Sequence, residues 1–253
     1  MQISIVNNVR SKPFPKLKGI CQVCGKPTIA KCGRNVSWHW AHVKSKKCDT
    51  WWENETEWHR SWKSHWPLEC QEIVHFDSTT GEKHIADIKL KDNTVIEIQN
   101  SSMSEKEMYS REEFYKTMIW IVNGKNFSTF PKILSKLPNP DLPESKDICI
   151  YPPNGISDEF LFHRLSEQDS DCKLVEIFSS RKIQELISDS HIGHRLFYWK
   201  RRREIWFRST KGVYFDFGTN YLFKIEVFNN RSPYCFLPVP KWQFIELFEG
   251  KKA

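Results

Sequence analysis

Residues 85–99 read IADIKLKDNTVIEIQ, and this stretch decides the fold of the N-terminal half of the chain. Its two β-branched segments, IADIKL and TVIEIQ, flank a short polar turn, which is the pattern of a β-hairpin. If Leu90 pairs with Thr94 across a three-residue loop, Asp87 lies directly opposite Glu97. The apolar residues between them then point to the other face, because side chains alternate along a strand.

The predicted hairpin therefore opposes two carboxylates. Like charges directly across a sheet repel, so Asp87 and Glu97 destabilise the hairpin unless a cation lies between them. Oxygen ligands that leave room for water and a phosphate suit Mg²⁺ or Mn²⁺. Gln99 shares the face of Glu97. A two- or four-residue loop would place the carboxylates on different faces, and an exposed polar face on an edge hairpin is the alternative interpretation.

Helices and a further strand are expected around the hairpin. Residues 53–66 (ENETEWHRSWKSHW) have aromatic side chains at helical spacing. Residues 104–117 begin with a serine followed three residues later by Glu107, which is a capping box that opens a helix. The following MIWIV is an apolar strand. The expected order is helix, hairpin, helix, strand.

The whole chain has 253 residues, of which 39% are hydrophobic and 27% charged, as in globular proteins of one large or two modest domains. It has no apolar run of membrane-spanning length, and its N-terminus lacks the apolar block of a signal peptide. A cytoplasmic protein without a membrane partner is expected. The formal net charge of +7 suits a polyanionic partner without requiring one.

Proline and polar residues between positions 131 and 153 predict a linker. The expected division is an N-terminal segment with a metal module (1–52), a core (53–130), the linker (131–153) and a C-terminal α+β domain of unknown role (154–253). In that last part FLFHRL and SSRKIQELISDSH are expected as helices. RLFYWK, EIWFRS, GVYFDF and YLFKIEVF are expected as strands, and KWQFIELF as either. This half is either a domain of its own or an extension of the first sheet.

A cluster of cysteines and histidines near the N-terminus predicts a structural zinc site, since thiolate and imidazole both suit Zn²⁺ and a closed four-ligand site leaves no open position. The expected ligands are Cys21, Cys24, His39 and His42, with Cys32 and Cys48 as competing ligands, so that a set such as Cys21, Cys24, His42 and Cys48 stays open. Buried free thiols beside surface histidines are the alternative.

Several of these motifs occur together in one order: CQVC, HWAH, ETEWHRSWK, HIADI and VIEIQNSSMSEKEMYSREEFYKTMIWIVNG. In this order they resemble the competence protein CoiA-like family, a branch of the PD-(D/E)xK nuclease superfamily, over residues 21–124. The resemblance implies an α+β, restriction-endonuclease-like (PD-(D/E)xK) core of helix, three antiparallel strands, helix and strand. In that pattern Asp87 and Glu97 are ligands of a catalytic Mg²⁺ (or Mn²⁺), and Glu57 matches an additional acidic ligand.

Gln99 stands where the superfamily usually has lysine. Glutamine supplies no positive charge, so the metal, a neutral hydrogen bond from the amide, or Lys89 or Lys63 would do that work. His59 and His84 could border the site, where they would orient water or contact phosphate, or could be surface histidines.

DNA-binding residues are expected in two places. Arg111 and Tyr115 share one helix face, where they could hold a phosphate and stack on a base, unless Arg111 only pairs with Glu107. Residues 195–211 (RLFYWKRRREIWFRSTK) interleave Arg201, Arg202 and Arg203 with aromatic rings. This pattern suits a nucleic-acid-binding hairpin as well as a solvated basic turn.

The leading hypothesis is a Mg²⁺-dependent nuclease that hydrolyses DNA phosphodiester bonds in DNA processing, competence or defence against foreign DNA, with Glu57, Asp87, Glu97 and Gln99 at its catalytic site. The alternative is a catalytically silent DNA-binding accessory protein on a nuclease scaffold. A second copy of the chain and a DNA-processing protein are the protein partners considered.

Overall fold

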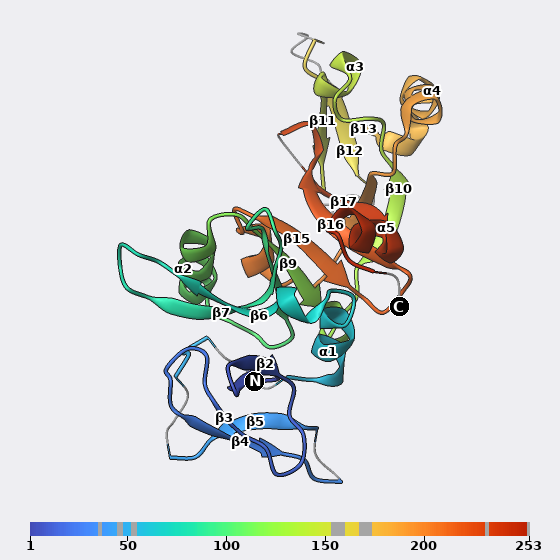
Figure 1. Cartoon of the computed structure of the whole chain (residues 1–253). Coiled ribbons are helices and arrows are strands. Elements are labelled where there is room, and N and C mark those ends of the chain that lie inside the picture. The colour runs from blue at the N-terminus through green and yellow to red at the C-terminus, as the bar shows by residue number, and fades with distance from the viewer. Residues whose placement is uncertain are drawn as a thin grey trace. The chain divides into compact units, whose positions relative to one another are not determined.

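The computed structural model describes residues 1–34, 37–44, 48–51, 55–152, 160–166, 174–230 and 233–251 (Figure 1). The chain divides into two compact units. Unit 1 comprises Met1–Asn123, Ser209–Lys211 and Trp242–Ala253, and unit 2 comprises Gly124–Arg208 and Gly212–Lys241. Both units mix helices and strands, which confirms the α+β class. No helix in the described ranges is both long enough and apolar enough to cross a membrane.

Unit 1 begins with a five-stranded antiparallel sheet, whose strand order is β2-β1-β3-β4-β5. The strands are β1 (Ser4–Val6), β2 (Val9–Ser11), β3 (Lys18–Ile20), β4 (Pro27–Lys31) and β5 (His39–His42). Trp40 of β5 is buried with Met1 and Cys21, and its indole N–H donates to the Ser11 carbonyl at 3.0 Å. Aromatic burial thus supplies a small core to a module that is poor in aliphatic residues.

The second part of unit 1 has the expected order of elements. These are α1 (Glu57–Lys63), the 3₁₀ turn η1 (Leu68–Cys70), β6 (Gln71–Phe76), β7 (Lys83–Lys89), β8 (Val95–Gln99), α2 (Glu105–Tyr115) and β9 (Met118–Asn123). Strands β6, β7 and β8 are antiparallel, and β9 runs parallel to β8 because α2 forms the crossover. Of the helix expected over 53–66, residues 53 and 54 lie outside the described part of the chain.

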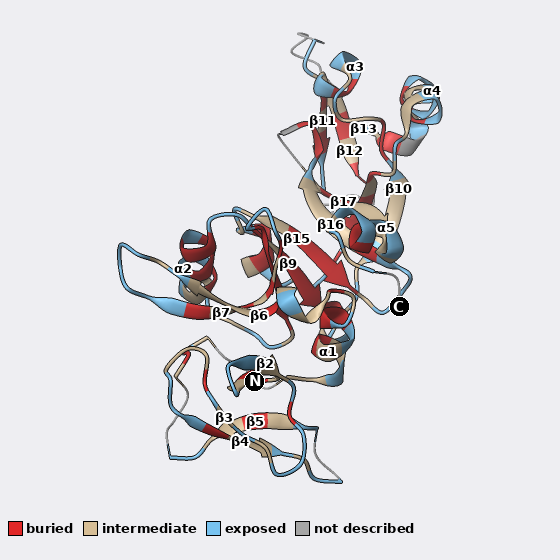
Figure 2. Ribbon diagram, in the orientation of Figure 1, coloured by how far each residue is buried: buried red, intermediate tan, exposed pale blue. Residues whose placement is uncertain are grey.

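The hairpin register agrees with the prediction. Ile88 pairs with Ile96 and Lys89 with Val95, so a three-residue loop joins β7 to β8. Asn93 in that loop takes a positive φ of 69°, which asparagine tolerates better than most residues. All five residues of β8 are buried, and Figure 2 shows β9 almost wholly buried as well. Both faces of β8 are therefore covered, whereas on β7 the apolar face is buried and the face that carries Asp87 is half-buried.

Two helices of unit 1 are held by a cap and by a ring contact. The hydroxyl of Ser104 caps α2 by accepting the N–H of Glu107 at 3.1 Å, as expected. Helix α5 (Lys241–Leu247) lies at the end of the chain, and its Phe244 ring meets Trp62 of α1 edge to face. KWQFIELF is thus a helix rather than a strand.

Unit 2 contains two groups of strands. One has the order β10-β14-β17-β16-β15 and the other β11-β12-β13. The strands are β10 (Lys132–Lys136), β11 (Ile148–Tyr151), β12 (Leu161–Arg164), β13 (Val175–Glu176), β14 (Arg195–Tyr198), β15 (Gly212–Asp216), β16 (Tyr221–Val227) and β17 (Tyr234–Pro240). The helices are α3 (Pro143–Lys146) and α4 (Arg181–Ser190), with 3₁₀ turns η2 (Gly124–Asn126), η3 (Ile177–Ser179), η4 (Glu204–Phe207) and η5 (Phe228–Asn230).

Three predictions for this half were wrong. The stretch 131–153 is no linker, because its described residues form β10, α3 and β11, with Pro143 at the start of α3, where its missing N–H costs nothing. FLFHRL contains strand β12, since a short apolar run fits either periodicity. EIWFRS contains the turn η4, in which the consecutive Trp206 and Phe207 are both buried, as alternation along a strand facing solvent would not allow.

Candidate functional site

Four side chains of unit 1 converge into a group that could hold a metal ion such as zinc. The ligand atoms of Cys21, Cys24, His42 and Cys48 all lie within 4.8 Å of one another. The sulfurs of Cys21 and Cys48 are 3.6 Å apart, and the sulfur of Cys24 is 3.3 Å from Nε2 of His42. Bond lengths of about 2.3 Å to sulfur and 2.0 Å to nitrogen predict ligand separations of roughly 3.5–3.8 Å around tetrahedral zinc. The spacing therefore fits a closed site and is too long for a disulfide, whose sulfurs are about 2.05 Å apart.

The local backbone explains how the first two cysteines meet. The N–H of Gly25 donates to the Cys21 carbonyl at 2.9 Å, and Gly25 has a φ of 69°. The N–H of Val23 also points to the Cys21 sulfur at 3.4 Å. This tight turn places both thiols on one side, and glycine adopts its positive φ without steric cost.

His39 and Cys32 are not part of this group within the described residues. His39 and His42 are three residues apart on strand β5, so their side chains point to opposite faces. The ring of His39 is hydrogen-bonded to the Ser37 carbonyl at 2.9 Å. The competing ligand Cys48 completes the set instead, which is the alternative left open by the sequence.

The metal group leads to a direct test. We expect the purified protein to carry about one equivalent of zinc, and Cys24→Ser or Cys48→Ser to lose it together with stability, because metal-binding energy is folding energy in a small module. His39→Ala, the matched control, should keep the metal. Elemental analysis and thermal unfolding measure both effects, and retention of zinc by Cys48→Ser would contradict this ligand set.

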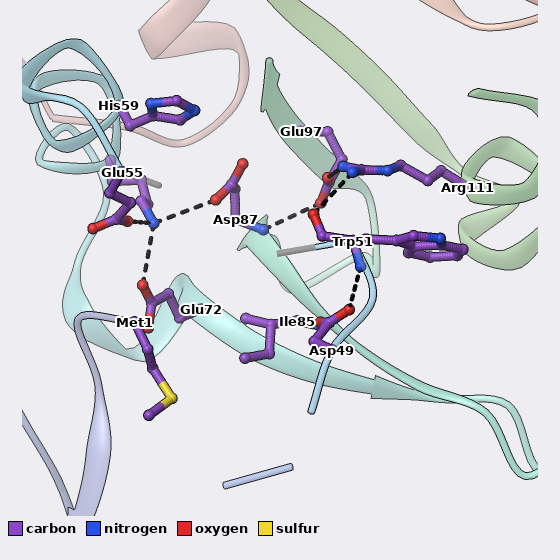
Figure 3. A pocket seen from close by; sticks show the side chains of 11 residues that line it. Met1, Asp49, Trp51, Glu55, His59, Glu72, Ile85, Asp87, Glu97 and Arg111 are labelled. Atoms are coloured by element: carbon purple, nitrogen blue, oxygen red, sulfur yellow. Dashed lines mark hydrogen bonds and ion pairs between the residues drawn. The ribbon is translucent and has the colours of Figure 1, made fainter. Parts of the chain in front are cut away.

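A second cluster in unit 1 surrounds a small, partly open pocket of about 50 Å³. Figure 3 shows Asp87 between Glu55 and His59 on one side and Glu97 and Arg111 on the other. The lining residues are Met1, Asp49, Trp51, Glu55, His59, Lys63, Glu72, Ile85, Asp87, Glu97 and Arg111. The pocket thus collects carboxylates and cations that lie far apart in the sequence.

Asp87 and Glu97 are cross-strand neighbours, as the hairpin register requires. The N–H of Asp87 donates to Oε1 of Glu97 at 3.3 Å, and the N–H of Ile98 donates to Oδ2 of Asp87 at 3.0 Å. Burial, together with the charge of Asp87, raises the pKa of Glu97 to about 8, and the guanidinium of Arg111 only partly offsets this. The repulsion predicted from the sequence therefore acts on Glu97.

Lys63 is the cation at the centre of the carboxylates. Its side chain is 4% exposed, and Nζ lies 3.2 Å from Glu72, 3.3 Å from Asp87 and in ion-pair contact with Glu55. Burial opposes its charge, but Glu72 and Asp87 outweigh burial and raise the pKa of Lys63. Burial likewise opposes the charge of Glu72, while Lys63 and the N–H groups of Gln2 and Ile3 hold its pKa below the usual value.

Three carboxylates of this cluster, Asp49, Glu55 and Glu72, were not found by sequence reasoning. His59 and Lys63 are four residues apart on α1 and share one side of it, but Glu55 precedes the N-cap Thr56, so no helical spacing indicates its place. Glu57, the predicted acidic ligand, is exposed and does not line the pocket. Glu57 is the first residue of α1, whereas Glu55 lies before the extended N-cap Thr56.

Arg111 pairs with two carboxylates. Its guanidinium donates to Glu97 at 3.1 Å and to Glu107 at 2.6 Å, and also to the Trp51 carbonyl at 2.9 Å. The pairing with Glu107, considered as an alternative, is therefore present. Tyr115 is 3% exposed and packs beside Trp51, and its stacking on a base stays a prediction.

Gln99 lies on β8 but does not line the pocket. It is 2% exposed, and its amide donates to the carbonyl and hydroxyl of Ser101 at 3.0 and 3.3 Å. Lys89, the other lysine considered, lies outside the pocket with Nζ 3.2 Å from the His75 ring. Of the lysines considered from the sequence, Lys63 is the one that lines the pocket and contacts Asp87.

Asp49 connects the metal group to the pocket, because it follows Cys48 directly. Its carboxylate accepts the N–H groups of Trp51 at 3.0 Å and Ile85 at 2.8 Å and lies 2.9 Å from Nδ1 of His84. Burial would raise the pKa of Asp49, but these contacts hold it below its usual value. The Trp51 ring stacks on His84 at 3.4 Å, so His84 is a buried partner rather than a surface histidine.

The basic residues of unit 2 do not form the predicted hairpin. Strand β14 pairs with β10 and β17, and η4 follows the basic run. Arg201 and Arg203 are exposed. Arg202 donates to Glu204 at 2.6 Å and lies over the Phe207 ring, 4.8 Å from its centroid. Their role in DNA binding stays a prediction.

Comparison of the chain with family models, with curated proteins and with solved structures finds no match.

Proposed function

We propose that the chain is a metal-dependent nuclease that hydrolyses DNA phosphodiester bonds. The observation that carries this proposal is the opposition of Asp87 and Glu97 in a small, partly open pocket, with Lys63 3.3 Å from Asp87. The resemblance to the CoiA-like nucleases agrees with it. DNA processing, competence or defence against foreign DNA would then be the setting.

The donor set fits Mg²⁺ or Mn²⁺. Asp87 and Glu97 offer hard oxygen ligands, and each of their oxygens contacts one donor of the chain, whereas a carboxylate oxygen can accept two. The raised pKa of Glu97 supports the need for a cation, because an ion between the carboxylates reverses their repulsion. A bound Mg²⁺ would supply an activated water and neutralise charge on the phosphate.

The cations of the pocket have distinct tasks in this proposal. Lys63 supplies the positive charge that Gln99 does not, and from the opposite side of Asp87 it would stabilise charge developing on the phosphate. Arg111 holds Glu97 in place through a charge-assisted hydrogen bond. Glu55, one of five carboxylates that line the pocket, has the role of additional acidic ligand in this proposal, which the sequence assigned to Glu57.

A catalytically silent DNA-binding protein is the second candidate. Two observations favour it: Gln99 is bonded to Ser101, and Lys63 already neutralises the carboxylates around it. A silent protein would bind DNA with or without Mg²⁺ and would leave it intact.

The two candidates are separated by incubating linear, circular and single-stranded DNA with the protein. A nuclease should cleave with Mg²⁺ or Mn²⁺, lose cleavage in EDTA and regain it when the metal is restored. EDTA can also remove zinc from the Cys/His group, so the zinc content of the protein is measured before and after the EDTA treatment. Intact DNA in Mg²⁺ and in Mn²⁺, with zinc retained, would favour the silent protein.

A further inference from the structure

His59 presents an unused hydrogen-bond donor to the carboxylate pocket. The side chain is 2% exposed and lines the pocket. Among the described residues, its Nε2 has no hydrogen-bond partner. A buried polar atom without a partner costs free energy, so such an atom in a pocket indicates a group that binds there.

The protonation of this ring follows from the helix cap. Helix α1 begins with a capping box in which the Thr56 hydroxyl accepts the N–H of His59 at 3.4 Å and the N–H of Thr56 donates to Nδ1 of His59 at 3.2 Å. An atom that accepts an N–H carries no proton, so the hydrogen of the neutral ring is on Nε2. A histidine thus occupies the position where Glu or Gln usually completes the box.

This arrangement excludes two other tasks for His59. Nε2 carries its hydrogen and so cannot be a metal ligand unless Nδ1 takes up a proton, which would face the N–H of Thr56. The neutral ring is not a general acid either, because loss of the Nε2 proton would leave an imidazolate. The role that remains for His59 is to donate a hydrogen bond from Nε2–H without transferring the proton.

We propose that His59 is a catalytic residue that donates its Nε2–H to a non-bridging oxygen of the scissile phosphodiester, a role that rests on the proposed nuclease function. The pocket of about 50 Å³ accepts a few atoms of the size of a water molecule, which suits phosphate oxygens and is too small for a base. The surrounding carboxylates offer no donor to a phosphate, and the three N–H groups of Lys63 face three carboxylates. Nε2 of His59 and Nε of Arg111 are the pocket donors without a partner among the described residues.

The test compares His59→Asn with wild type in the Mg²⁺-dependent DNA cleavage assay. The side-chain oxygen of asparagine can accept the N–H of Thr56 in place of Nδ1 and so keep the helix cap. The shorter side chain does not place a donor at the position of Nε2. We expect kcat to fall about 100-fold, as on loss of one transition-state donor. His59→Gln, which also completes a capping box, is the second variant and should fall at least tenfold. Ser61→Ala, exposed on the same helix, is the matched control and should cleave as wild type.

A phosphorothioate at the scissile position tests the contact itself. If His59 donates to that oxygen, the sulfur substitution and His59→Asn act on one interaction, and in Mn²⁺ their combined effect is smaller than the product of the two single effects. If the combined effect equals the product of the two single effects for both diastereomers, the proposal is overturned. Cleavage at the wild-type rate by both His59 variants, with Asp87→Asn inactive, would also overturn it. Cleavage retained by Asp87→Asn would instead overturn the proposed function.

Discussion

Asp87→Asn is expected to lower DNA cleavage by at least about a thousandfold while the free energy of unfolding in metal-free buffer stays level or rises. The loss of activity follows because the carboxylate would be a ligand of the catalytic ion. The free energy of unfolding does not fall, because asparagine carries no charge and the substitution therefore relieves the repulsion that raises the pKa of Glu97. Lys63 loses one ion pair in this variant but keeps Glu55 and Glu72.

The measurement is a cleavage assay beside urea unfolding in buffer without Mg²⁺, Mn²⁺ or chelator, with Glu82→Gln as control. Glu82 is exposed in the turn before β7, so its neutralisation should change neither quantity. A structural polar pair would lose stability and leave cleavage unchanged. Cleavage that persists in Asp87→Asn protein free of contaminating nuclease would exclude the proposed site.

Lys63→Met should have the opposite effect on stability. The substitution removes the cation from three carboxylates and leaves buried negative charge without compensation, which costs about 3–5 kcal/mol. Cleavage should be lost as well, since Lys63 is the lysine beside Asp87. Lys89→Met, on the same hairpin but outside the pocket, is the matched control and should retain cleavage.

Adding Glu72→Gln to Lys63→Met should recover part of the lost stability without recovering cleavage. The double variant removes one of the uncompensated charges, and an amide can still accept the N–H groups of Gln2 and Ile3. Urea unfolding of the two single variants and the double variant measures this coupling. Wild-type stability of Lys63→Met would contradict the described ion pairs.

The hairpin was predictable because its register is a local property. One loop length fixes which residues of β7 and β8 face each other, and the alternation of apolar residues agrees with only one choice. The opposition of Asp87 and Glu97 then follows from the sequence alone. The same holds for the Ser104 cap, which depends on residues three positions apart.

The remaining members of the pocket depend on tertiary contacts. Glu72 reaches Lys63 from another strand and has a positive φ of 47°, which no local signal in the sequence indicates. Glu55 precedes the N-cap Thr56 of α1, so helical periodicity does not place it in the pocket, and its contact with Lys63 is what brings it there. The prediction of His39 as a zinc ligand was wrong because two histidines three residues apart on a strand point to opposite faces.

The adjacency of Cys48 and Asp49 has a consequence for genetics. One residue belongs to the metal group and the next fixes the Trp51 segment, whose carbonyl holds Arg111. Loss of the metal would release this short segment and, with it, one wall of the pocket. In a screen for inactive alleles, substitutions of the cysteines would therefore abolish activity as substitutions of the carboxylates do, although the cysteines take no part in the proposed chemistry. Suppressors of the cysteine alleles should map to residues that hold Asp49 or Trp51 in place, whereas alleles of Asp87 should have none there.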